Sequence, residues 1–222
     1  MTWHYKTTDR PGWAGVYSQD QTDNAEEIWN TLVGVHGWTE EATAAVLGNF
    51  QVESYINPGQ WELYQNYDRQ LGMGLGQWTP STKVSDYVHS TNKDDMANGA
   101  RQLLLLVNTP GQYTTDYLNP DGTSNYYNES GLPYIADMND FSHSTASVSD
   151  LAKVWAICWE RPRNTYYATS KQSRIDHATH WYATFTGTQP SPPSPPDPPS
   201  PPAPGYITDE LWLAIFMSKM VR

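Results

Sequence analysis

Glu53 is the residue whose setting in this sequence most favours acid–base chemistry. It lies in the stretch GNFQVESYINPG, residues 48–59, among apolar side chains. Pro58 disfavours helix before it, so we expect Glu53 at the C-terminal end of a helix. Apolar surroundings and the negative end of a helix both disfavour a carboxylate. The sequence therefore predicts an acid that keeps its proton near neutral pH and can donate it to a leaving oxygen.

A structural role for Glu53 is equally compatible with this position. A glutamate at a helix end can also act as a cap or pair with a lysine or arginine, and pairing is what usually allows a charged residue to be buried. Position alone leaves both roles open.

A second carboxylate for such chemistry has two candidates downstream, Glu62 and Asp68. Glycosidases with two carboxylates hold them about 5–5.5 Å apart when retaining and about 6.5–9.5 Å apart when inverting. Both candidates lie in residues 60–80, which we expect to form a β-hairpin or strand-like loop. Asp68 stands beside Tyr67 and Arg69, and this polar setting favours the ionised form. A solvated turn aspartate has the same surroundings, so the second carboxylate stays open.

Glycines alternate at positions 72, 74 and 76 of that segment. In a strand all three would lie on one face. A flat ligand could approach such a face closely because it carries no side chains. A loose glycine loop is the alternative.

The charge balance excludes one class of partner. The net charge is 13 − 24 = −11, and no run of Lys and Arg occurs. A nucleic-acid surface needs clustered basic residues, so no nucleic acid is expected as a partner. The chain holds 10 Trp and 15 Tyr against 4 Phe. These rings combine an apolar face with a polar group and suit sugar surfaces, although burial in the core is their commoner role.

Metal and redox chemistry find little support. Cys158 is the single cysteine, which excludes an internal disulfide and a cysteine-rich metal site. His177 and His180 have a spacing that could bind a metal, but without an evident carboxylate partner we expect a solvated helix face. HExxH, P-loop and nucleophile-elbow motifs are absent from the sequence. We therefore expect neither a metal nor a cofactor.

Targeting segments are not evident. The N-terminal stretch MTWHYKTTDR is polar and lacks the apolar region of a secretory signal. The longest apolar stretches, residues 103–107 and 211–217, are too short to span a bilayer. No transmembrane segment is expected.

Residues 1–188 are expected to form one mainly α (α+β) domain. Asp23 and Glu26 suit a capping box for a first helix that Gly37 ends. A second helix follows Thr39 and runs to Glu53. Apolar periodicity and turn residues predict further helices over residues 82–107, 147–161 and 170–185, with a turn-rich excursion over residues 108–140.

Two further segments follow this domain. Residues 189–205 include PSPPSPPDPPSPPAP, a polyproline II linker of roughly 45 Å at about 3.1 Å per residue. Residues 206–222 then have the pattern of a short amphipathic helix, which is marginal alone in water and needs a partner. Because its polar face has few basic residues, we expect it to dock on a protein.

Several motifs occur together in a recognisable order. VES and NPG are followed by GLGQW and by a helix ending in ERP. The sequence thereby resembles the phage tail lysozyme family, which is related to goose-type lysozymes and lytic transglycosylases. The matching pieces are NAEEIWNTL, GWTEEATAAVLGNFQVESYINPGQWE, GMGLGQWTPSTK, FSHSTASVSDLAKVWAICWERP and RIDHATHWYATF, between residues 23 and 186. Gly76 departs from the pattern, because a bulkier residue is expected there.

The resemblance implies a lysozyme-like helical fold with a small β-hairpin and cleavage of bacterial peptidoglycan. Glu53 would be the general acid that protonates the β-1,4 oxygen between N-acetylmuramic acid and N-acetylglucosamine. The glycine-rich segment would form the opposite wall of the cleft, where Gln77 and Trp78 hold N-acetyl groups or shape the wall.

Other residues have roles implied by the same resemblance. Tyr166 and Tyr167 would stack on a sugar, and Glu62 is a further candidate for substrate contact. Glu160 is expected to be structural, paired with Arg161 or with backbone donors.

Alternatives to a hydrolase stay open. In a lytic transglycosylase on the same fold, the muramic acid's own hydroxyl attacks and Glu53 acts without a fixed partner. A virion structural or glycan-binding module without turnover belongs to another class. The expected location is a phage tail acting on the host cell wall, with residues 206–222 attached to tail proteins. Release from the host cytoplasm as an endolysin is the alternative.

Overall fold

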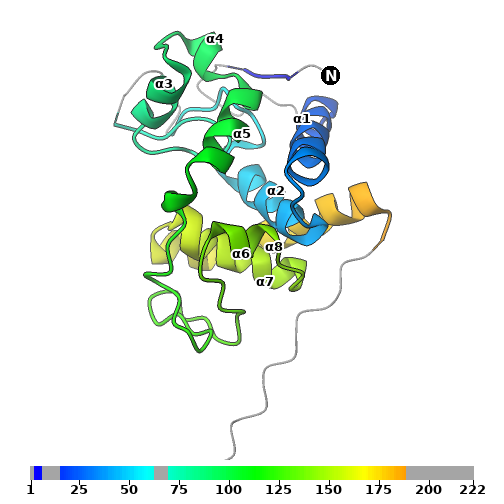
Figure 1. Cartoon of the computed structure of the whole chain (residues 1–222), viewed down its shortest axis with the longest axis vertical. Helices are drawn as coiled ribbons and strands as arrows, with labels where there is room; N and C mark the ends of the chain where they lie inside the picture. The colour runs from blue at the N-terminus through cyan, green and yellow to red at the C-terminus, as the bar shows by residue number, and fades with distance from the viewer. Residues whose placement is uncertain (1–2, 7–15, 63–69, 189–222) are drawn as a thin grey trace, which may run out of the picture.

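Helix α2 (Glu40–Ser54) lies at the centre of the molecule and is buried along most of its length. The computed structural model describes residues 3–6, 16–62 and 70–188. In Figure 1, helices α3 to α5 gather at one end of the molecule and α6 to α8 at the other, with α2 between them. Besides α2, the helices are α1 (Gln19–Trp29), α3 (Thr82–Val88), α4 (Lys93–Met96), α5 (Gly99–Asn108), α6 (Met138–Ser142), α7 (Val148–Trp155) and α8 (Asn164–Thr186). The predicted mainly helical fold class is confirmed.

Short helical segments of other types follow α1, α5 and α7. The π-helical η1 (Asn30–Val35) continues α1, and the π-helical η4 (Ala156–Glu160) continues α7. A 3-10 turn, η3 (Pro110–Gln112), follows α5. The motif ERP therefore begins at the end of a π-helix, where Arg161 adopts a left-handed conformation and stops the chain from continuing as helix.

Gly48 allows α2 and α8 to touch. A Cβ at this position would lie 2.5 Å from the carbonyl oxygen of Arg174 and 2.6 Å from Cβ of Ala178. Any larger residue would push the two helices apart. The close contact brings the middle of α8, with Arg174, against the C-terminal half of α2.

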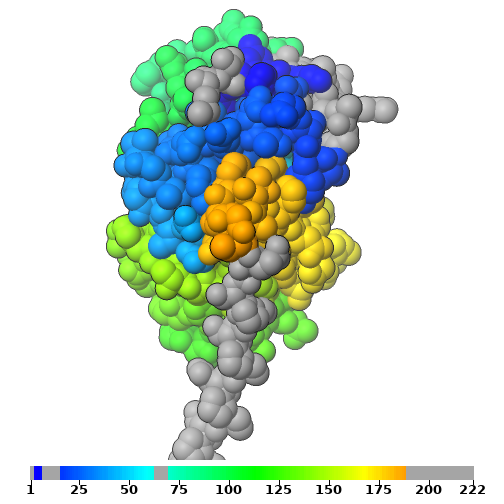
Figure 2. Space-filling model, turned by 90° about the vertical axis from the view of Figure 1, so that its right-hand side faces the viewer, coloured from blue at the N-terminus to red at the C-terminus, as the bar shows by residue number. Residues whose placement is uncertain are grey.

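The other end of α8 packs on the first helix. The rings of Trp29 and Phe185 have centroids 4.9 Å apart. Figure 2 shows this end of α8, in orange, at the surface against the blue segments that include α1 and α2. Helix α8 thus connects the N-terminal helix with the central one.

The predicted start of the first helix is wrong by about one turn. Helix α1 begins at Gln19, because Ser18 caps it and forms the capping box with Gln21. Asp23 and Glu26 lie inside the helix. The prediction for α2 is confirmed, since Thr39 caps it through the backbone N–H of Ala42 and the helix ends at Ser54.

Residues 82–107 form three helices where the sequence predicted one. Asn92 accepts a hydrogen bond from the backbone N–H of Asp94, and Asn98 accepts one from that of Arg101. Asparagine is among the best N-cap residues, so each of them starts a new helix. The last helix also differs from its prediction, because α8 begins at Asn164 rather than near residue 170.

The predicted β-hairpin is reduced to isolated pairs. In the described part of residues 60–80, Met73 forms antiparallel bridges with Trp61 and with Trp78. A Cβ on Gly72 would lie 2.7 Å from the carbonyl oxygen of Gln77, and one on Gly74 would lie 2.4 Å from a side-chain atom of Gln102. The expectation of a bare glycine face for a flat ligand is therefore wrong, because protein atoms already lie against these glycines.

Some predictions lie outside the described residues. These are the second-carboxylate candidate Asp68, the linker over residues 189–205 and the helix over residues 206–222. Among the helices that the structure describes, none combines the length and apolarity needed to cross a bilayer.

Candidate functional site

Glu53 lies in the last turn of α2 and forms an ion pair with Arg174 of α8. Its Oε1 accepts a hydrogen bond from Nη2 of Arg174 at 2.5 Å. The Glu53 side chain is 16% exposed, whereas that of Arg174 is 1% exposed. The expectation of an apolar pocket around Glu53 is wrong. Pairing with an arginine, the alternative that position left open, is what the structure contains.

A buried network holds Arg174 in place. Its Nη1 donates to Oδ1 of Asn49 at 2.7 Å, and its Nε lies 3.4 Å from Oγ of Ser170. Asn49 in turn donates to the carbonyl oxygens of Ala45 and Ala152. These bonds connect α2, α7 and α8, so the guanidinium that faces Glu53 has a fixed orientation.

Glu160 is a second carboxyl group at this site. Its Oε1 accepts a hydrogen bond from Nε1 of Trp155 at 3.0 Å. The Trp155 ring stacks on Trp159, with centroids 4.8 Å apart, which fixes the donor. Burial and the negative charge of Glu53 raise the pKa of Glu160 well above its ordinary range, against the opposing effect of Arg174. A structural role was expected for Glu160, for example through Arg161 or backbone donors. Its hydrogen-bond donor in the structure is the indole of Trp155, and the charge of Arg161 also lowers its pKa.

Two tyrosines give this site an exposed aromatic surface. Tyr166 is 47% exposed and Tyr55 is 37% exposed. The centroid of the Tyr166 ring lies 5.9 Å from Cζ of Arg174. Burial and the charge of Glu53 raise the pKa of Tyr166. The rings are exposed enough to contact a ligand that reaches Glu53.

The glycine-rich segment lies against the end of α2. Oγ of Ser54 donates to the carbonyl oxygen of Leu75 at 2.9 Å. A Cβ on Gly76 would lie 3.1 Å from Cε1 of Phe50 and 3.7 Å from Nε1 of Trp159. Position 76, where a bulkier residue was expected, therefore packs directly on the helix that carries Glu53.

Gln102 holds the same segment from its other side. Its Oε1 accepts from the backbone N–H of Leu75, and its Nε2 donates to the carbonyl oxygens of Pro58 and Met96. All three bonds are buried. One side chain of α5 thereby joins the glycine segment to the turn that follows Glu53.

Four of the predicted substrate-binding residues make hydrogen bonds to the backbone or are buried in the core. Gln77 donates its side-chain amide to the carbonyl oxygens of Gln60 and Gly74, and Glu62 accepts a bond from the backbone N–H of Gly72. Trp78 and Tyr167 are each 1% exposed. Of the predicted set within the described residues, Glu53 and Tyr166 are the two that lie together at the Arg174 network.

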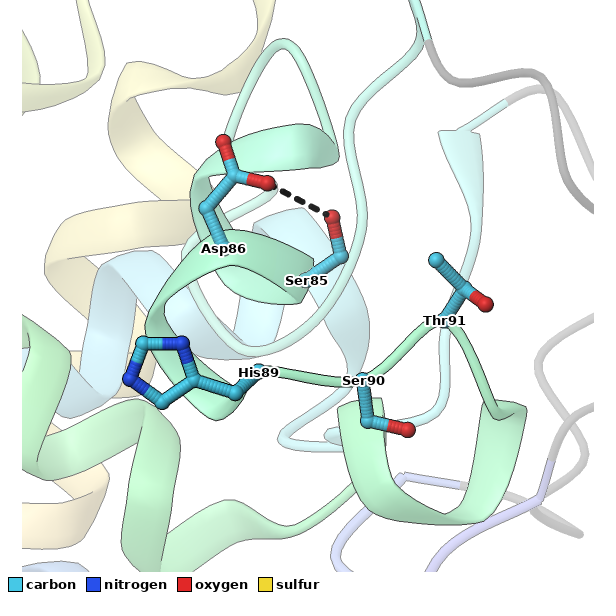
Figure 3. Close-up of a pocket in the computed structure, with 5 residues that line it drawn as sticks. All are labelled: Ser85, Asp86, His89, Ser90 and Thr91. Atoms are coloured by element: carbon cyan, nitrogen blue, oxygen red, sulfur yellow. Dashed lines mark hydrogen bonds between the residues drawn. The ribbon is translucent and has the colours of Figure 1, made fainter.

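A pocket is present elsewhere, over the end of α3. It is lined by Ser85, Asp86, His89, Ser90 and Thr91, and Figure 3 shows the Ser85–Asp86 hydrogen bond at its edge. None of the residues predicted from the sequence lines it. It is also an open depression with no direct connection to the Glu53 network among its lining residues.

The histidine pair is packed rather than solvated. Nδ1 of His177 lies 2.5 Å from Oη of Tyr17, and the Tyr17 ring stacks on His180 with centroids 3.6 Å apart. The expectation of a solvated helix face at His177 and His180 is therefore wrong. Among the residues that the structure describes, no group of three or more His, Cys, Asp or Glu side chains could hold a metal ion.

Sequence reasoning missed Arg174, Asn49 and Gln102. Arg174 opens the motif RIDHATHW and stands beside Ile175 and Ala178 on the apolar side of a predicted helix. An arginine on the buried face of a helix needs an acidic or carbonyl partner. That pattern could have pointed to Glu53.

The helical fold, with the acidic cluster at the end of its central helix, defines a lysozyme-like domain. A family model described as phage tail lysozyme matches residues 23–185. The chain therefore belongs to the phage tail lysozyme family. It is also 31% identical over 171 residues to Morphogenesis protein 1 of Bacillus phage B103, a match that covers 76% of this chain and 41% of that protein. The chain thus spans less than half the length of this relative.

Proposed function

We propose that this domain cleaves the glycan strands of bacterial peptidoglycan, with Glu53 as the general acid. Membership of the phage tail lysozyme family supports a glycosidase-type activity. The observation that carries the assignment is the position of Glu53. It is a partly exposed carboxyl at the end of the central helix, next to the exposed ring of Tyr166.

The proposed bond is the β-1,4 linkage between N-acetylmuramic acid and N-acetylglucosamine. Protonation of the bridging oxygen is needed because an alkoxide leaves poorly. Tyr166 and Tyr55 provide ring surface for a sugar near this acid. Gln77, Trp78, Glu62 and Tyr167 act by holding the surrounding segments in place.

Asp68 remains the proposed second carboxylate. It belongs to residues 63–69, which lie outside the described residues. On either side of them, the backbone N–H of Glu62 donates a hydrogen bond to the carbonyl oxygen of Gly72. An ionised Asp68 would stabilise positive charge that develops on the sugar ring. Without it, the substrate's own hydroxyl would attack, and the product would be an anhydro sugar.

Muropeptide analysis of digested cell walls tests the assignment. The wild type should release new glycan ends, whereas Glu53→Gln should release almost none. Glu41→Gln is the matched control, because Glu41 lies on the same helix, about 18 Å away at 1.5 Å per residue, and accepts a bond from Tyr182. Reducing ends identify a hydrolase and anhydro ends a lytic transglycosylase. Equal cleavage by wild type and Glu53→Gln would rule out Glu53 as the acid.

A module without turnover is the second candidate. The ion pair of Glu53 with a buried arginine favours it, because a carboxylate neutralised in this way resembles a structural pair. Cell walls that bind the purified wild type but gain no new glycan ends would support this alternative.

The relative's name supports a role in the virion. Morphogenesis protein 1 is a phage protein, and we propose that this chain acts on the host wall as part of a phage tail. Residues 206–222 would dock on tail proteins at the end of the proline-rich linker. Release as an endolysin is the alternative, and detection of the chain in purified virions distinguishes the two.

A further inference from the structure

Three tyrosine rings pack together in the excursion between η3 and α6, residues 113–137. The centroids of Tyr117 and Tyr126 lie 5.0 Å apart, and both rings meet Tyr127 edge-on, at 5.8 and 4.7 Å. Tyr127 is buried, whereas Tyr117 is 39% exposed and Tyr126 is 47% exposed. Two exposed rings therefore rest on a buried third one, and we call Tyr117 and Tyr126 the tyrosine platform.

The excursion that carries this platform is long and irregular, yet it is held in place. It contains no helix, and in Figure 1 it forms the green loops that project from the end of the molecule where α6 to α8 gather. Ser124 and Glu129 exchange two backbone hydrogen bonds on either side of Tyr126 and Tyr127. Lys171 of α8 donates to the Glu129 carboxylate. Long ordered loops of this kind are uncommon in compact domains and are usually functional.

The platform is anchored on the turn that leads into the Glu53 site. Oη of Tyr127 donates to the carbonyl oxygen of Pro162 at 2.8 Å, between η4 and α8. The Tyr127 ring also packs on Tyr167, with centroids 4.7 Å apart. Tyr167 directly follows Tyr166, the exposed ring near Arg174. The platform thus has a fixed position next to the start of the helix that supports Glu53.

The surroundings of the platform fit an uncharged sugar. The larger aliphatic side chains of the excursion, Leu118, Leu132 and Ile135, are all buried, which disfavours an apolar protein partner. The excursion has no Lys or Arg, so it offers nothing to a nucleic acid. Asn125 and Asn128, beside the tyrosines, are exposed and can bond hydroxyl groups. A sugar ring combines a flat C–H face with hydroxyls at its rim, which matches tyrosine rings among exposed amides.

We propose that the tyrosine platform binds sugar rings of the glycan strand, away from the bond that Glu53 cleaves. This inference rests on the proposed function and gives the same substrate a second region of contact. Tyr127 holds the two exposed rings in place before the strand arrives, so little order is lost on binding. The platform touches no reacting atom, and its effect is to hold the strand when cell wall is scarce.

Sedimentation with isolated cell-wall sacculi, freed of proteins and teichoic acids, tests the binding. The full chain is used with Glu53→Gln so that the glycan stays intact. Tyr117→Ala and Tyr126→Ala should each raise the Kd about three- to tenfold, whereas Tyr126→Phe, which keeps the ring, should not. Soluble N-acetylglucosamine oligomers should compete for the protein.

Tyr134→Ala is the matched control. Tyr134 lies in the same excursion and is 43% exposed, but it forms none of these ring pairs. Its removal should leave the Kd unchanged, and circular dichroism should show the same helix content in every variant. Folded Tyr117→Ala and Tyr126→Ala variants that bind sacculi like the wild type would overturn the proposal and leave the rings to another partner, such as a protein. Equal losses in Tyr126→Phe or Tyr134→Ala would also overturn it, because stacking on the platform would not explain them.

Cleavage by chains that keep Glu53 separates this inference from the proposed function. Tyr126→Ala should raise the wall concentration that gives half the maximal rate and leave the maximal rate unchanged. A fall in the maximal rate alone would contradict a role in holding the strand. Binding that depends on the platform in a protein that cleaves no wall would refute the proposed function and leave the platform standing. Cleavage and binding that are indifferent to both tyrosines would do the reverse.

Discussion

Arg174 of α8 donates a hydrogen bond to Glu53 of α2 across 121 residues of sequence. The bond is buried at the arginine end and partly exposed at the glutamate end. It fixes the carboxyl that we propose as the acid and joins the two longest helices of the domain. Stability and activity should therefore depend on the same pair.

Arg174→Met should destabilise the fold strongly. Removal of the guanidinium leaves Glu53 and Glu160 without their common positive partner, and loss of one member of a buried pair costs about 3–5 kcal/mol. Urea unfolding followed by circular dichroism measures the change. Arg163→Met is the control, because Arg163 is exposed just before the same helix, and its free energy of unfolding should change by less than about 0.5 kcal/mol. Equal changes in the free energy of unfolding would show that the buried ion pair contributes no more to stability than an exposed arginine does.

Gly48→Ala should weaken both stability and cleavage. The added methyl group meets the Arg174 carbonyl oxygen and Ala178 within 2.6 Å, and overpacking of this kind costs about 1–3 kcal/mol. The resulting shift between α2 and α8 should also misalign Glu53 and Arg174. Thermal unfolding and wall cleavage measure the two effects.

Gly34→Ala provides the opposite case. Nothing lies within 4 Å of a Cβ at Gly34, in the helical segment η1. Alanine there should leave the protein unchanged or stabilise it by about 0.4–1 kcal/mol. A destabilisation as large as that of Gly48→Ala would contradict the helix-contact argument.

The parts of the fold that local sequence determines were predictable. The start of α2 follows from the cap at Thr39, and its end follows from the approach to Pro58. The end of η4 at Arg161 was equally visible from the proline that follows it. The prediction failed where two residues could cap the same helix. Helix α1 begins after Ser18, which forms a capping box with Gln21, rather than after the predicted cap Asp23.

The candidate site was predictable only in part, because its partners come from distant segments. Glu53 could be selected from its own neighbours in the chain. Its pairing with Arg174 depends on a helix contact that Gly48 permits, and nothing local to Glu53 indicates it. The burial of Trp78 likewise results from packing against Phe50. The family resemblance suggested that Trp78 holds N-acetyl groups or shapes the cleft wall, whereas the tertiary structure buries it in the core.

Gln102→Leu should loosen the glycine-rich segment while leaving the rest of the domain folded. Three buried backbone groups lose their partner, and each unsatisfied group costs about 1–3 kcal/mol. Hydrogen exchange should become faster at the Leu75 amide, which donates to Gln102. Gln172→Leu is the control, because Gln172 is exposed and bonds a side chain on its own helix. Unchanged protection at Leu75 in Gln102→Leu would show that other contacts hold the segment.

The packing of His177 against Tyr17 should make the protein sensitive to acid. Burial lowers the pKa of His177, with an opposing effect of Asp176. A base with a lowered pKa in the folded state binds fewer protons there than in the unfolded chain. Its contribution to stability is thus present above about pH 6.5, the unfolded value, and is lost as the pH falls through the folded pKa.

The variant His177→Gln should remove this dependence. Urea unfolding at a series of pH values should show that the wild type loses stability relative to His177→Gln as the solution becomes more acidic. His36→Gln is the control for loss of an exposed imidazole, because His36 is exposed after η1. A difference between the wild type and His177→Gln that stays constant with pH would mean that the contact with Tyr17 tolerates a protonated ring.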